Sequence, residues 1–342
     1  MSRFTLVGPL YPYRGGIAHF LETMYRGLGA RGHNLEAITY TRQYPELLFP
    51  GKTQLAEERP ADSVPAERLI DTLNPWSWIK TGLHVRRRRP DALVYKYWMP
   101  FFAPAYGTVT RMARHRGVRS IVVVDNALPH ERRPGDKLLG RYFLNACDGF
   151  IVMSESVEDD LRALGASAPI RRVQHPTYDR FGDAPSKQQA RSALDLPPDA
   201  PVLLFFGFEA PYRRRIVEHG LTDSVHLHAG YVADDTVPRY FAAADAVVQP
   251  YVSATQSGVA QIAFHFEKPV ITTDVGGLAE IVPHEEAGLV VPPERPARLA
   301  GAVTRFFDEA LAPTLAEGVR AQKQKHSWDP LYEAVEELAS AR

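Results

Sequence analysis

The sequence predicts an α/β protein in two halves, each built on a parallel sheet flanked by helices. Short apolar runs, typical of buried parallel strands, alternate with segments whose apolar residues recur at helical spacing. Each half opens with such a run, at residues 4–7 and 201–207. At 342 residues the chain is long enough for two domains with separate cores. We therefore expect two domains of similar construction.

The first half begins with a strand at residues 4–7, a glycine-rich loop, a helix at 18–28 and a second strand at 35–40. In the loop, Gly15 and Gly16 would let a ligand approach the backbone closely, although a flexible turn explains such a pair equally well. Residues 42–80 are rich in Pro, Glu and Arg and lack a clear pattern. We expect a long loop there with one short helix.

A basic run at residues 85–90 precedes the next strand, at 92–95. Such a run is usually a solvated helix end, and contact with anionic lipid headgroups is the alternative. The first half then continues with alternating helices and strands, expected at residues 101–116, 120–124, 138–146, 149–152, 157–164 and 170–173.

Polar residues directly follow the strand at 120–124. Because the carboxyl ends of strands in an open parallel sheet border the ligand crevice, Asp125 is expected to point into it. His130, five residues further on, could act as an acid or base near neutral pH. A role in capping or orienting the loop is an equally good interpretation of His130.

The second half follows a linker at residues 179–200, which contains a small helix around 187–194. The domain boundaries are therefore expected at 1–178, 179–200 and 201–327, with a C-terminal helix at 328–342. The expected strands and helices of the second half lie at residues 201–207, 225–228, 237–244, 246–249, 257–266, 269–273, 288–291, 296–311, 313–324 and 329–341.

Two loops of the second half resemble each other in position. Ser257 and Gly258 mark the point where one loop becomes a helix, and Gly276 and Gly277 mark the same point after the next strand. Helix starts present free N–H groups and a positive dipole end, which suit a bound phosphate. This pattern predicts half of a site for an anionic, nucleotide-like ligand.

The composition narrows the class of protein. Lys plus Arg and Asp plus Glu balance at 40 each, which argues against a nucleic-acid partner. The single cysteine, Cys147, allows no internal disulfide and lies in an apolar run, so we expect it to pack in a core. No segment is long and apolar enough to cross a bilayer, and no signal peptide is evident. We expect a cytoplasmic protein.

Several motifs together resemble glycosyltransferase family 4. They are GlyGlyIle at 15–17, GlyHis at 32–33, the run at 234–245, GluLysProValIle at 267–271 and GlyGlyLeuAlaGlu at 276–280. The resemblance implies the GT-B architecture: two Rossmann-like domains facing a central cleft, with the C-terminal helix expected to pack back on the N-terminal domain. It also implies retaining transfer of a sugar from a nucleotide-sugar donor, UDP- or GDP-linked, without a metal or other cofactor. The donor would bind mainly to the C-terminal domain, and the acceptor to the N-terminal one.

The donor loop departs from the usual family pattern. Two Glu positions of the family fall on Ala254 and Ile262 here. The loop instead resembles a subgroup with ThrGlnSerGly, which assigns contacts with the donor sugar and diphosphate to Thr255, Gln256, Ser257 and Gly258. Ser257 is equally interpreted as a simple helix cap. Glu280 matches the family's Glu near the donor sugar or ribose, and a solvated first-turn Glu is its plainer interpretation.

Two further departures concern catalysis. Many relatives carry a His where this chain has Asp125, so Asp125 or His130 would fill that role. After Gly207, one strand–helix unit of the family is missing, together with the Arg and Lys that hold the diphosphate. The arginines that follow are Arg213, Arg214 and Arg215. We expect them to lie on the next helix and face solvent, and contact of one of them with the diphosphate is the alternative. A lost central strand would leave a hole in the sheet unless its neighbours pair again.

The function expected from the resemblance is a retaining glycosyltransferase that moves a sugar to a hydroxyl of a glycan, a lipid-linked sugar or a small molecule. The alternative is a catalytically weak or inactive relative that binds a nucleotide-sugar or a partner, suggested by the missing segment. The expected partners are the donor and the acceptor, without nucleic acid. Peripheral contact with the inner face of the membrane through the basic run remains open.

Overall fold

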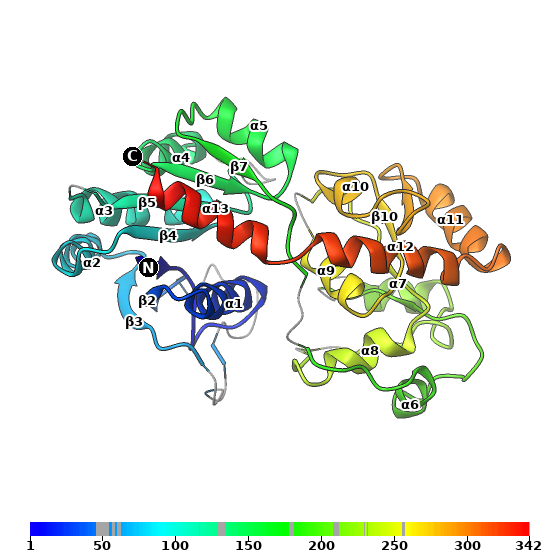
Figure 1. Ribbon diagram of the computed structural model, residues 1–342. Helices are drawn as coiled ribbons and strands as arrows, with labels where there is room; N and C mark the ends of the chain where they lie inside the picture. The colour runs from blue at the N-terminus through cyan, green and yellow to red at the C-terminus, as the bar shows by residue number, and fades with distance from the viewer. Residues whose placement is uncertain are drawn as a thin grey trace. The chain divides into compact units, whose positions relative to one another are not determined.

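The computed structural model describes residues 1–45, 55–56, 59, 63–115, 117–128, 134–177, 181–207, 212–228, 230, 232–254 and 257–341. The chain forms two compact units, labelled by their elements in Figure 1. Unit 1 comprises Met1–Pro176, Ser253–Gln256 and Ser327–Arg342. Unit 2 comprises Thr177–Val252 and Ser257–His326.

Unit 1 contains a seven-stranded sheet in the order β3-β2-β1-β4-β5-β6-β7, with every neighbouring pair parallel. The chain order reverses direction at β1, whose neighbours are β2 and β4, so the carboxyl ends of β1, β4 and β5 lie along one edge. The strands are β1 (Arg3–Val7), β2 (Asn34–Arg42), β3 (Glu67–Asp71), β4 (Ala92–Tyr97), β5 (Arg119–Val124), β6 (Gly149–Val152) and β7 (Ile170–Arg172).

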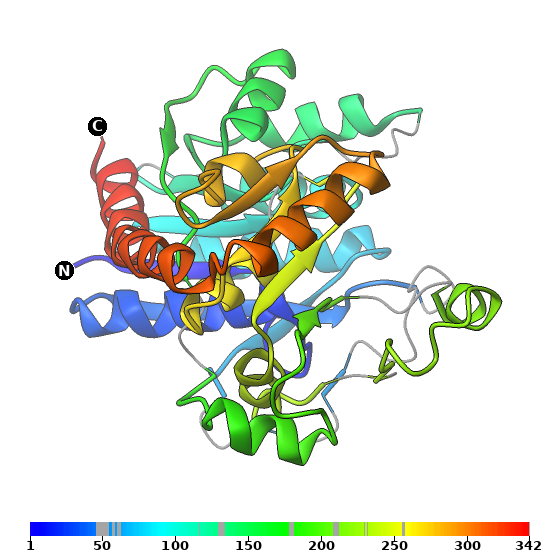
Figure 2. The same cartoon turned by 90° about the vertical axis from the view of Figure 1, so that its right-hand side faces the viewer.

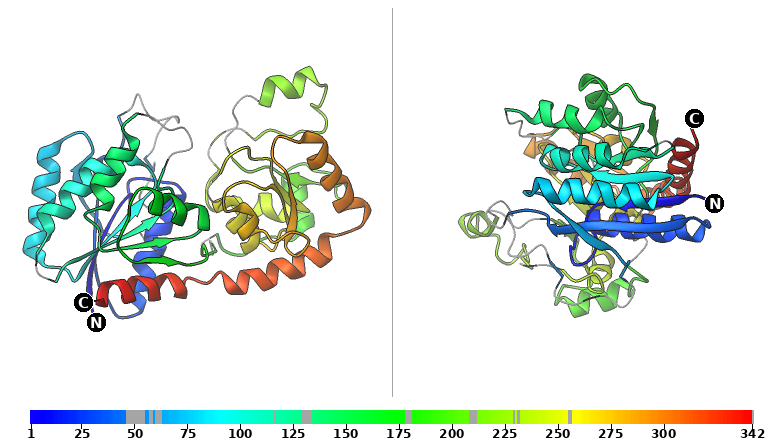
Figure 3. Two further views of the ribbon diagram at one scale, coloured as in Figure 1. Left: turned by 90° about the horizontal axis from the view of Figure 1, so that it is seen from above. Right: turned by 90° about the vertical axis from the view of Figure 1, so that its left-hand side faces the viewer.

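Helices cover both faces of this sheet, which explains why all six residues of β4 are buried. Helices α2 to α5 share one core, rich in Tyr and Phe, with residues of β2, β4, β5 and β6. Helices α1 and α13 contact each other, and both lie against strands of this sheet (Figure 3, left). The helices are α1 (Gly16–Ala30), α2 (Pro75–Arg88), η2 (Pro100–Phe102, a 3-10 turn), α3 (Ala103–Ala113), α4 (Asp136–Leu144), α5 (Glu155–Ala163) and α13 (Asp329–Ser340).

The C-terminal helix α13 packs on β5 and β6, which confirms the expectation that it returns to the N-terminal unit. Its apolar stripe of Leu331, Val335 and Leu338 recurs at helical spacing and is buried. Gly149 opens β6 just where Leu338 packs, since a Cβ there would approach Leu338 to 2.9 Å. The stripe therefore specifies the docking face of α13.

Unit 2 contains a four-stranded parallel sheet in the order β11-β10-β9-β8. Figure 2 shows β9, β10 and β11 in yellow to orange, with α11 beside them. The elements are α6 (Lys187–Ala193), β8 (Leu203–Leu204), α7 (Tyr212–Glu218), α8 (Val237–Ala243), β9 (Ala246–Gln249), α9 (Gly258–His265), β10 (Val270–Thr273), α10 (Leu278–Ile281), β11 (Gly288–Val291), α11 (Pro296–Asp308) and α12 (Ala312–Lys325).

The structure corrects two expectations. Residues 42–80 are not only a loop with a short helix, because they contain the edge strand β3 and the first turns of the 14-residue helix α2. Residues 225–228, predicted as a strand, form none in the described part of unit 2. Of the two outcomes left open for the second sheet, a hole or new pairing, the described residues show pairing: β8 pairs directly with β9 and lies at the edge.

The described residues lack two features that would suggest other classes of protein. None of the helices they form is long and apolar enough to cross a membrane. They also contain no group of three or more His, Cys, Asp or Glu side chains arranged to hold a metal ion. Cys147 is buried, as expected, and burial raises the pKa of its thiol well above the usual value.

Candidate functional site

The glycine pair lies where β1 leads into α1. Gly15 is the N-cap of α1 and has φ 110°, a conformation that L side chains rarely adopt. A Cβ at Gly15 would meet no atom within 4 Å, so the requirement for glycine is conformational and not steric. Gly15 provides no side-chain cap, so the first N–H groups of α1 are left for another acceptor.

Asp125 lies at the carboxyl end of β5 and is half-buried. Its Oδ1 accepts a hydrogen bond from Nζ of Lys96, at 2.7 Å. Lys96 projects from β4, the neighbouring strand, and its side chain is only 1% exposed, whereas that of Asp125 is 19% exposed. One end of the ion pair is therefore enclosed, and the other borders solvent at the ligand edge of the sheet.

Lys96 has no counterpart among the predicted site residues. Its Nζ lies 3.5 Å from the ring centroid of Phe20 on α1, so an aromatic face and a carboxylate both contact the ammonium group. Burial lowers the pKa of Lys96 and raises that of Asp125, while each partner opposes the shift of the other. Burying a lysine inside a strand costs free energy unless the ammonium group has a partner. Lys96 within an apolar strand was therefore the sequence feature that could have indicated a functional residue.

The start of α9 follows β9 by a short loop. Ser257 is the N-cap, and its hydroxyl oxygen accepts a hydrogen bond from the Ala260 N–H at 3.1 Å. The Gln249 Nε2 at the end of β9 also donates to this oxygen, at 2.6 Å. Ser257 and Gln249 are 3% and 1% exposed. The predicted change from loop to helix at Ser257 and Gly258 is confirmed, and Ser257 does cap the helix.

Two buried glutamine side chains near the start of α9 have amide atoms without a hydrogen-bond partner in the described part of the chain. The Gln249 Oε1 and both amide atoms of Gln261 on α9 make no hydrogen bond within the described residues. Gln261 is fully buried. An unpaired buried polar group costs about 1–3 kcal/mol, so such groups concentrate at sites that gain a partner in another state.

Gly276 and Gly277 follow β10 and precede α10, a helix of four residues. Gly276 has φ 52°, again in the region that favours glycine. Glu280 is exposed in the only turn of α10. A hollow of about 300 Å³ lies beside it, lined by Asp274, Ala279, His284, Val290, Val291 and Pro292.

Three predicted site residues, His130, Thr255 and Gln256, lie outside the described residues. The arginines that follow the proposed deletion are described: Arg213, Arg214 and Arg215 are exposed on α7, as expected, and Arg214 pairs with Glu218 of the same helix. Of the predicted residues, Ser257 and Gly258 lie together at α9 in unit 2, whereas Gly15, Gly16 and Asp125 belong to unit 1.

Comparisons with known proteins define the class first. Residues 15–176 match the family model of a glycosyl transferase 4-like domain, and residues 191–309 match that of glycosyl transferases group 1. The structure resembles sucrose-phosphate synthase from Thermosynechococcus elongatus (TM-score 0.77, 19% identity, 99% of this chain and 98% of that one). It also resembles Anabaena HepE in complex with UDP and glucose (TM-score 0.76, 15% identity, 99% and 100%). The fold is the GT-B fold of glycosyltransferases.

Sequence relatives define the family more narrowly. The D-inositol 3-phosphate glycosyltransferase of Acidothermus cellulolyticus is 32% identical over 387 residues, covering 94% of this chain and 84% of the relative. That of Streptomyces bingchenggensis is 28% identical over 243 residues, covering 57% and 53%. The chain belongs to the group 1, glycosyltransferase 4-like family, whose members transfer a sugar from a nucleotide-sugar donor with retention of configuration.

Proposed function

We propose that the donor is a UDP- or GDP-sugar whose diphosphate lies at the start of α9. The observation that carries this proposal is the N-cap of α9: Ser257 occupies the Ala260 N–H, which leaves the first N–H groups of the helix, including that of Gly258, free for an anion. The site follows the parallel strand β9, where ligands bind in open α/β sheets. HepE, of similar fold, has been solved with UDP, which makes UDP the first candidate.

The remaining contacts with the nucleotide-sugar donor are proposed from the ThrGlnSerGly motif and the two glycine pairs. In this proposal Thr255 and Gln256 contact the donor sugar, replacing the glutamates that the family carries at the positions of Ala254 and Ile262. Gly276 and Gly277 allow close approach of the donor to the backbone, and Glu280 lies near its sugar or ribose. Gly15 and Gly16, with the uncapped start of α1 in unit 1, would provide N–H groups for an anionic group of a substrate.

Asp125 is proposed to bind the hydroxyl group of the acceptor. Its Oδ1 is held by Lys96, and the carboxylate retains acceptor capacity on Oδ2. His130 is the second candidate for this role. The family chemistry requires no nucleophile on the protein: the leaving phosphate takes the proton of the hydroxyl on the same face of the sugar, and fixed N–H dipoles stabilise its charge.

The acceptor is proposed to be a hydroxyl-rich molecule, as a glycan, a lipid-linked sugar or a polyol phosphate would be. The name of the two relatives described above supports the last of these, since each is a D-inositol 3-phosphate glycosyltransferase.

The donor proposal is tested by calorimetric titration of the purified chain with UDP, GDP and ADP. We expect saturable binding of one of the first two. Binding of none of the three nucleotides would overturn the proposed donor site.

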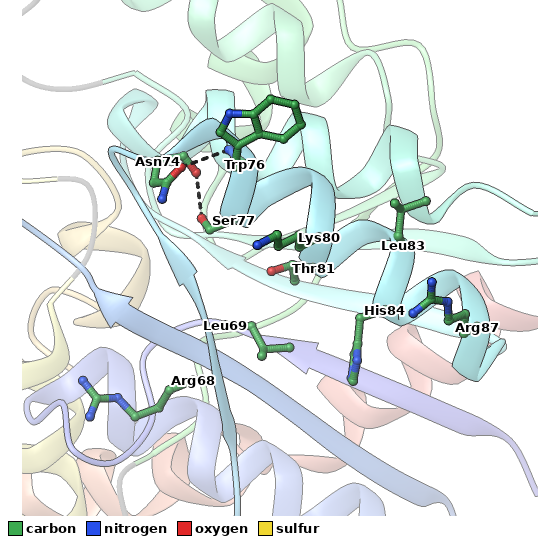
Figure 4. A pocket seen from close by; sticks show the side chains of 10 residues that line it. All are labelled: Arg68, Leu69, Asn74, Trp76, Ser77, Lys80, Thr81, Leu83, His84 and Arg87. Carbon is green, nitrogen blue, oxygen red and sulfur yellow. Dashed lines mark hydrogen bonds between the residues drawn. The ribbon is translucent and has the colours of Figure 1, made fainter.

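Contact with a membrane surface is a second proposal, supported by the outer side of α2. Trp76 is 70% exposed there and Leu83 is 39% exposed, beside the exposed Arg86 and Arg87. Figure 4 shows Trp76, Leu83 and Arg87 among the side chains around a hollow at α2 and β3. The hollow has a volume of about 410 Å³ and is lined by Arg68, Leu69, Asn74, Trp76, Ser77, Lys80, Thr81, Leu83, His84 and Arg87. Aromatic and basic side chains on one helix face suit an anionic lipid surface.

The structure sharpens the test of this second proposal. Arg88 pairs with Glu36 and Glu67, so only Arg86 and Arg87 should be replaced. The double variant Arg86→Ser/Arg87→Ser should lose sedimentation with vesicles of anionic phospholipid. The matched control is Arg213→Ser/Arg215→Ser on α7, equally exposed but in unit 2, which should keep it. Equal losses in both variants, or no sedimentation of the unaltered chain, would contradict the proposal.

A further inference from the structure

The side chains of Gln249, Tyr251 and Ser257 form a small hydrogen-bonded network at the start of α9. The Gln249 Nε2 donates to the Ser257 hydroxyl oxygen at 2.6 Å and to the Tyr251 phenol oxygen at 3.3 Å. The side-chain oxygens of Ser257 and Tyr251 therefore accept hydrogen bonds from the same nitrogen atom. The backbone beneath them is fixed by two threonines of β10: Thr272 donates to the Gln249 carbonyl, and Thr273 to that of Tyr251.

The Ser257 hydroxyl group has one hydrogen-bonding capacity left, the donation of its proton. Its oxygen accepts from Gln249 Nε2 and from the Ala260 N–H, which fills both lone pairs. The hydroxyl proton must therefore be donated, and the Tyr251 phenol oxygen is the acceptor that the same network holds close. Donors thus point in one direction, from Gln249 and Ser257 toward Tyr251.

Tyr251 ends this chain of donors. Its oxygen accepts from the network, so its own O–H is the group left to donate. Tyr251 is half-buried, and burial raises the pKa of the phenol, against the smaller opposite effect of the Gln249 and Ser257 hydrogen bonds. The phenol therefore keeps its proton at neutral pH, and none of the hydrogen bonds among the described residues uses that proton.

We propose that Tyr251 donates its phenolic hydrogen to a phosphate oxygen of the donor's diphosphate, making it a ligand-contacting residue that the loop motif does not reveal. This inference rests on the donor site proposed above. A phosphate oxygen is the fitting acceptor, because the free N–H groups of α9 next to Ser257 select an anion. Gln249 and Ser257 are positioning residues that act through Tyr251.

The surroundings of Tyr251 make its hydrogen bond more important for diphosphate binding than a bond from a single neutral donor usually is. The arginines of α7 are exposed, and Arg214 is paired with Glu218, so the described part of unit 2 shows no arginine of α7 buried at a site. A hydrogen bond from a neutral donor to a charged group contributes more than one between neutral groups. The polar donors at α9 would then carry the diphosphate.

The test compares Tyr251→Phe with Tyr240→Phe by calorimetric titration with UDP and with UDP-glucose. Tyr240 is a matched control, because it is also half-exposed in unit 2 but makes an edge-to-face contact with His228 and no hydrogen bond to this network among the described residues. We expect Tyr251→Phe to weaken binding of both ligands about ten- to a hundredfold, the usual effect of losing a hydrogen bond to a charged group. Tyr240→Phe should bind as the unaltered chain does.

The outcomes separate this inference from the proposed function. If the unaltered chain binds no nucleotide, the donor site itself is wrong. If it binds UDP and Tyr251→Phe binds equally well, Tyr251 makes no contact and only this inference is wrong. A loss confined to UDP-glucose would place the contact on the sugar and would also overturn the assignment to the diphosphate. Calorimetric melting of both variants checks that unit 2 remains folded.

Discussion

At the scale of single residues, the ion pair between Lys96 and Asp125 distinguishes unit 1. Placing an ammonium group inside a buried strand costs several kcal/mol unless a partner compensates it. Here the compensation comes from the Asp125 carboxylate and the Phe20 ring. Asp125 was predictable, because a polar residue after a buried strand is a visible pattern. Its partner lies 29 residues earlier on another strand, and only the β4–β5 register brings the two together.

Removing one member of this pair should destabilise unit 1 strongly. Lys96→Met leaves Asp125 half-buried without its partner, and we expect the free energy of unfolding to fall by about 3–5 kcal/mol. All four tryptophans of the chain, Trp76, Trp78, Trp98 and Trp328, belong to unit 1, so urea unfolding followed by tryptophan fluorescence reports this unit alone.

The double variant Lys96→Met/Asp125→Leu is the control for that prediction. Replacing a buried ion pair by apolar residues of similar volume is often close to neutral, so most of the lost stability should return. A double variant as unstable as Lys96→Met would show that the ion pair is not what the single replacement disturbs.

At the scale of elements, the docking of α13 on unit 1 depends on close packing with α1. A Cβ at Gly27 of α1 would overlap the Tyr332 ring of α13. Tyr332 also stacks on Trp328 and lies under the guanidinium of Arg31. Gly27 is therefore required by contact between two helices and not by its backbone conformation.

Gly27→Ala should lower the stability of unit 1 by about 1–3 kcal/mol, the usual cost of inserting a methyl group into a filled contact. Gly29→Ala in the same helix is the matched control, since its Cβ would meet no atom within 4 Å. That replacement should be neutral or raise stability by up to about 1 kcal/mol through helix propensity. Equal effects of the two replacements in urea unfolding would contradict the proposed α1–α13 contact.

The same helix contact should make unit 1 sensitive to acid. Hydrogen bonds from Arg31 and then His33 lower the pKa of Glu336 on α13 to about 2. Because this pKa is lower when folded than the ordinary value of 4.5, the resulting stability is complete above pH 4.5 and is lost as the pH falls toward 2.

Glu336→Gln should therefore reduce the fall in the urea midpoint of unit 1 between pH 6 and pH 3. Glu333→Gln, an exposed replacement on the same helix, should leave that fall unchanged. If Glu336→Gln shows the same fall as the unaltered chain, the ion pairs of Glu336 do not contribute to docking.

Elements were predictable where a segment carries a continuous apolar run, and were missed where it does not. The strands β4, β5, β6, β9 and β10 are almost wholly buried, and the sequence predicts each of them. The edge strand β3 was missed because only Ile70 among its five residues is buried. For residues 225–228 the error was the opposite one, because a strand was predicted and none forms. Their composition is strand-like, but the described part of unit 2 offers no neighbouring strand for them to pair with.

At the scale of the whole molecule, the second sheet shows how the chain could lack one strand–helix unit of the family. The sequence resemblance placed the loss after Gly207 and left two outcomes for the sheet, a hole or new pairing between the neighbouring strands. The structure shows β8 paired with β9 at the edge of the sheet, so the sheet is shorter but continuous. The alignment with the Acidothermus relative is longer than this chain, which agrees with a segment present there and missing here.

The shortened edge leaves the α9 side of the sheet intact. Strands β9, β10 and β11 keep their parallel pairing, and the helix start proposed for the diphosphate follows β9. The expected loss would follow β8, after Gly207, and the next described helix, α7, buries none of its residues. Donor binding should therefore persist, with the arginine and lysine contacts of the family replaced by neutral donors.

The most direct test is to incubate the purified chain with UDP-, GDP- and ADP-sugars, with and without D-myo-inositol 3-phosphate, and to measure released nucleoside diphosphate. We expect release from one donor base, faster with a suitable acceptor, and a product with the anomeric configuration of the donor by NMR. Thermal unfolding with the same donor should shift upward, because a ligand at about 100 times its Kd stabilises by about 2.7 kcal/mol. No release from any donor, with or without a thermal shift, would contradict the central claim and leave an inactive relative.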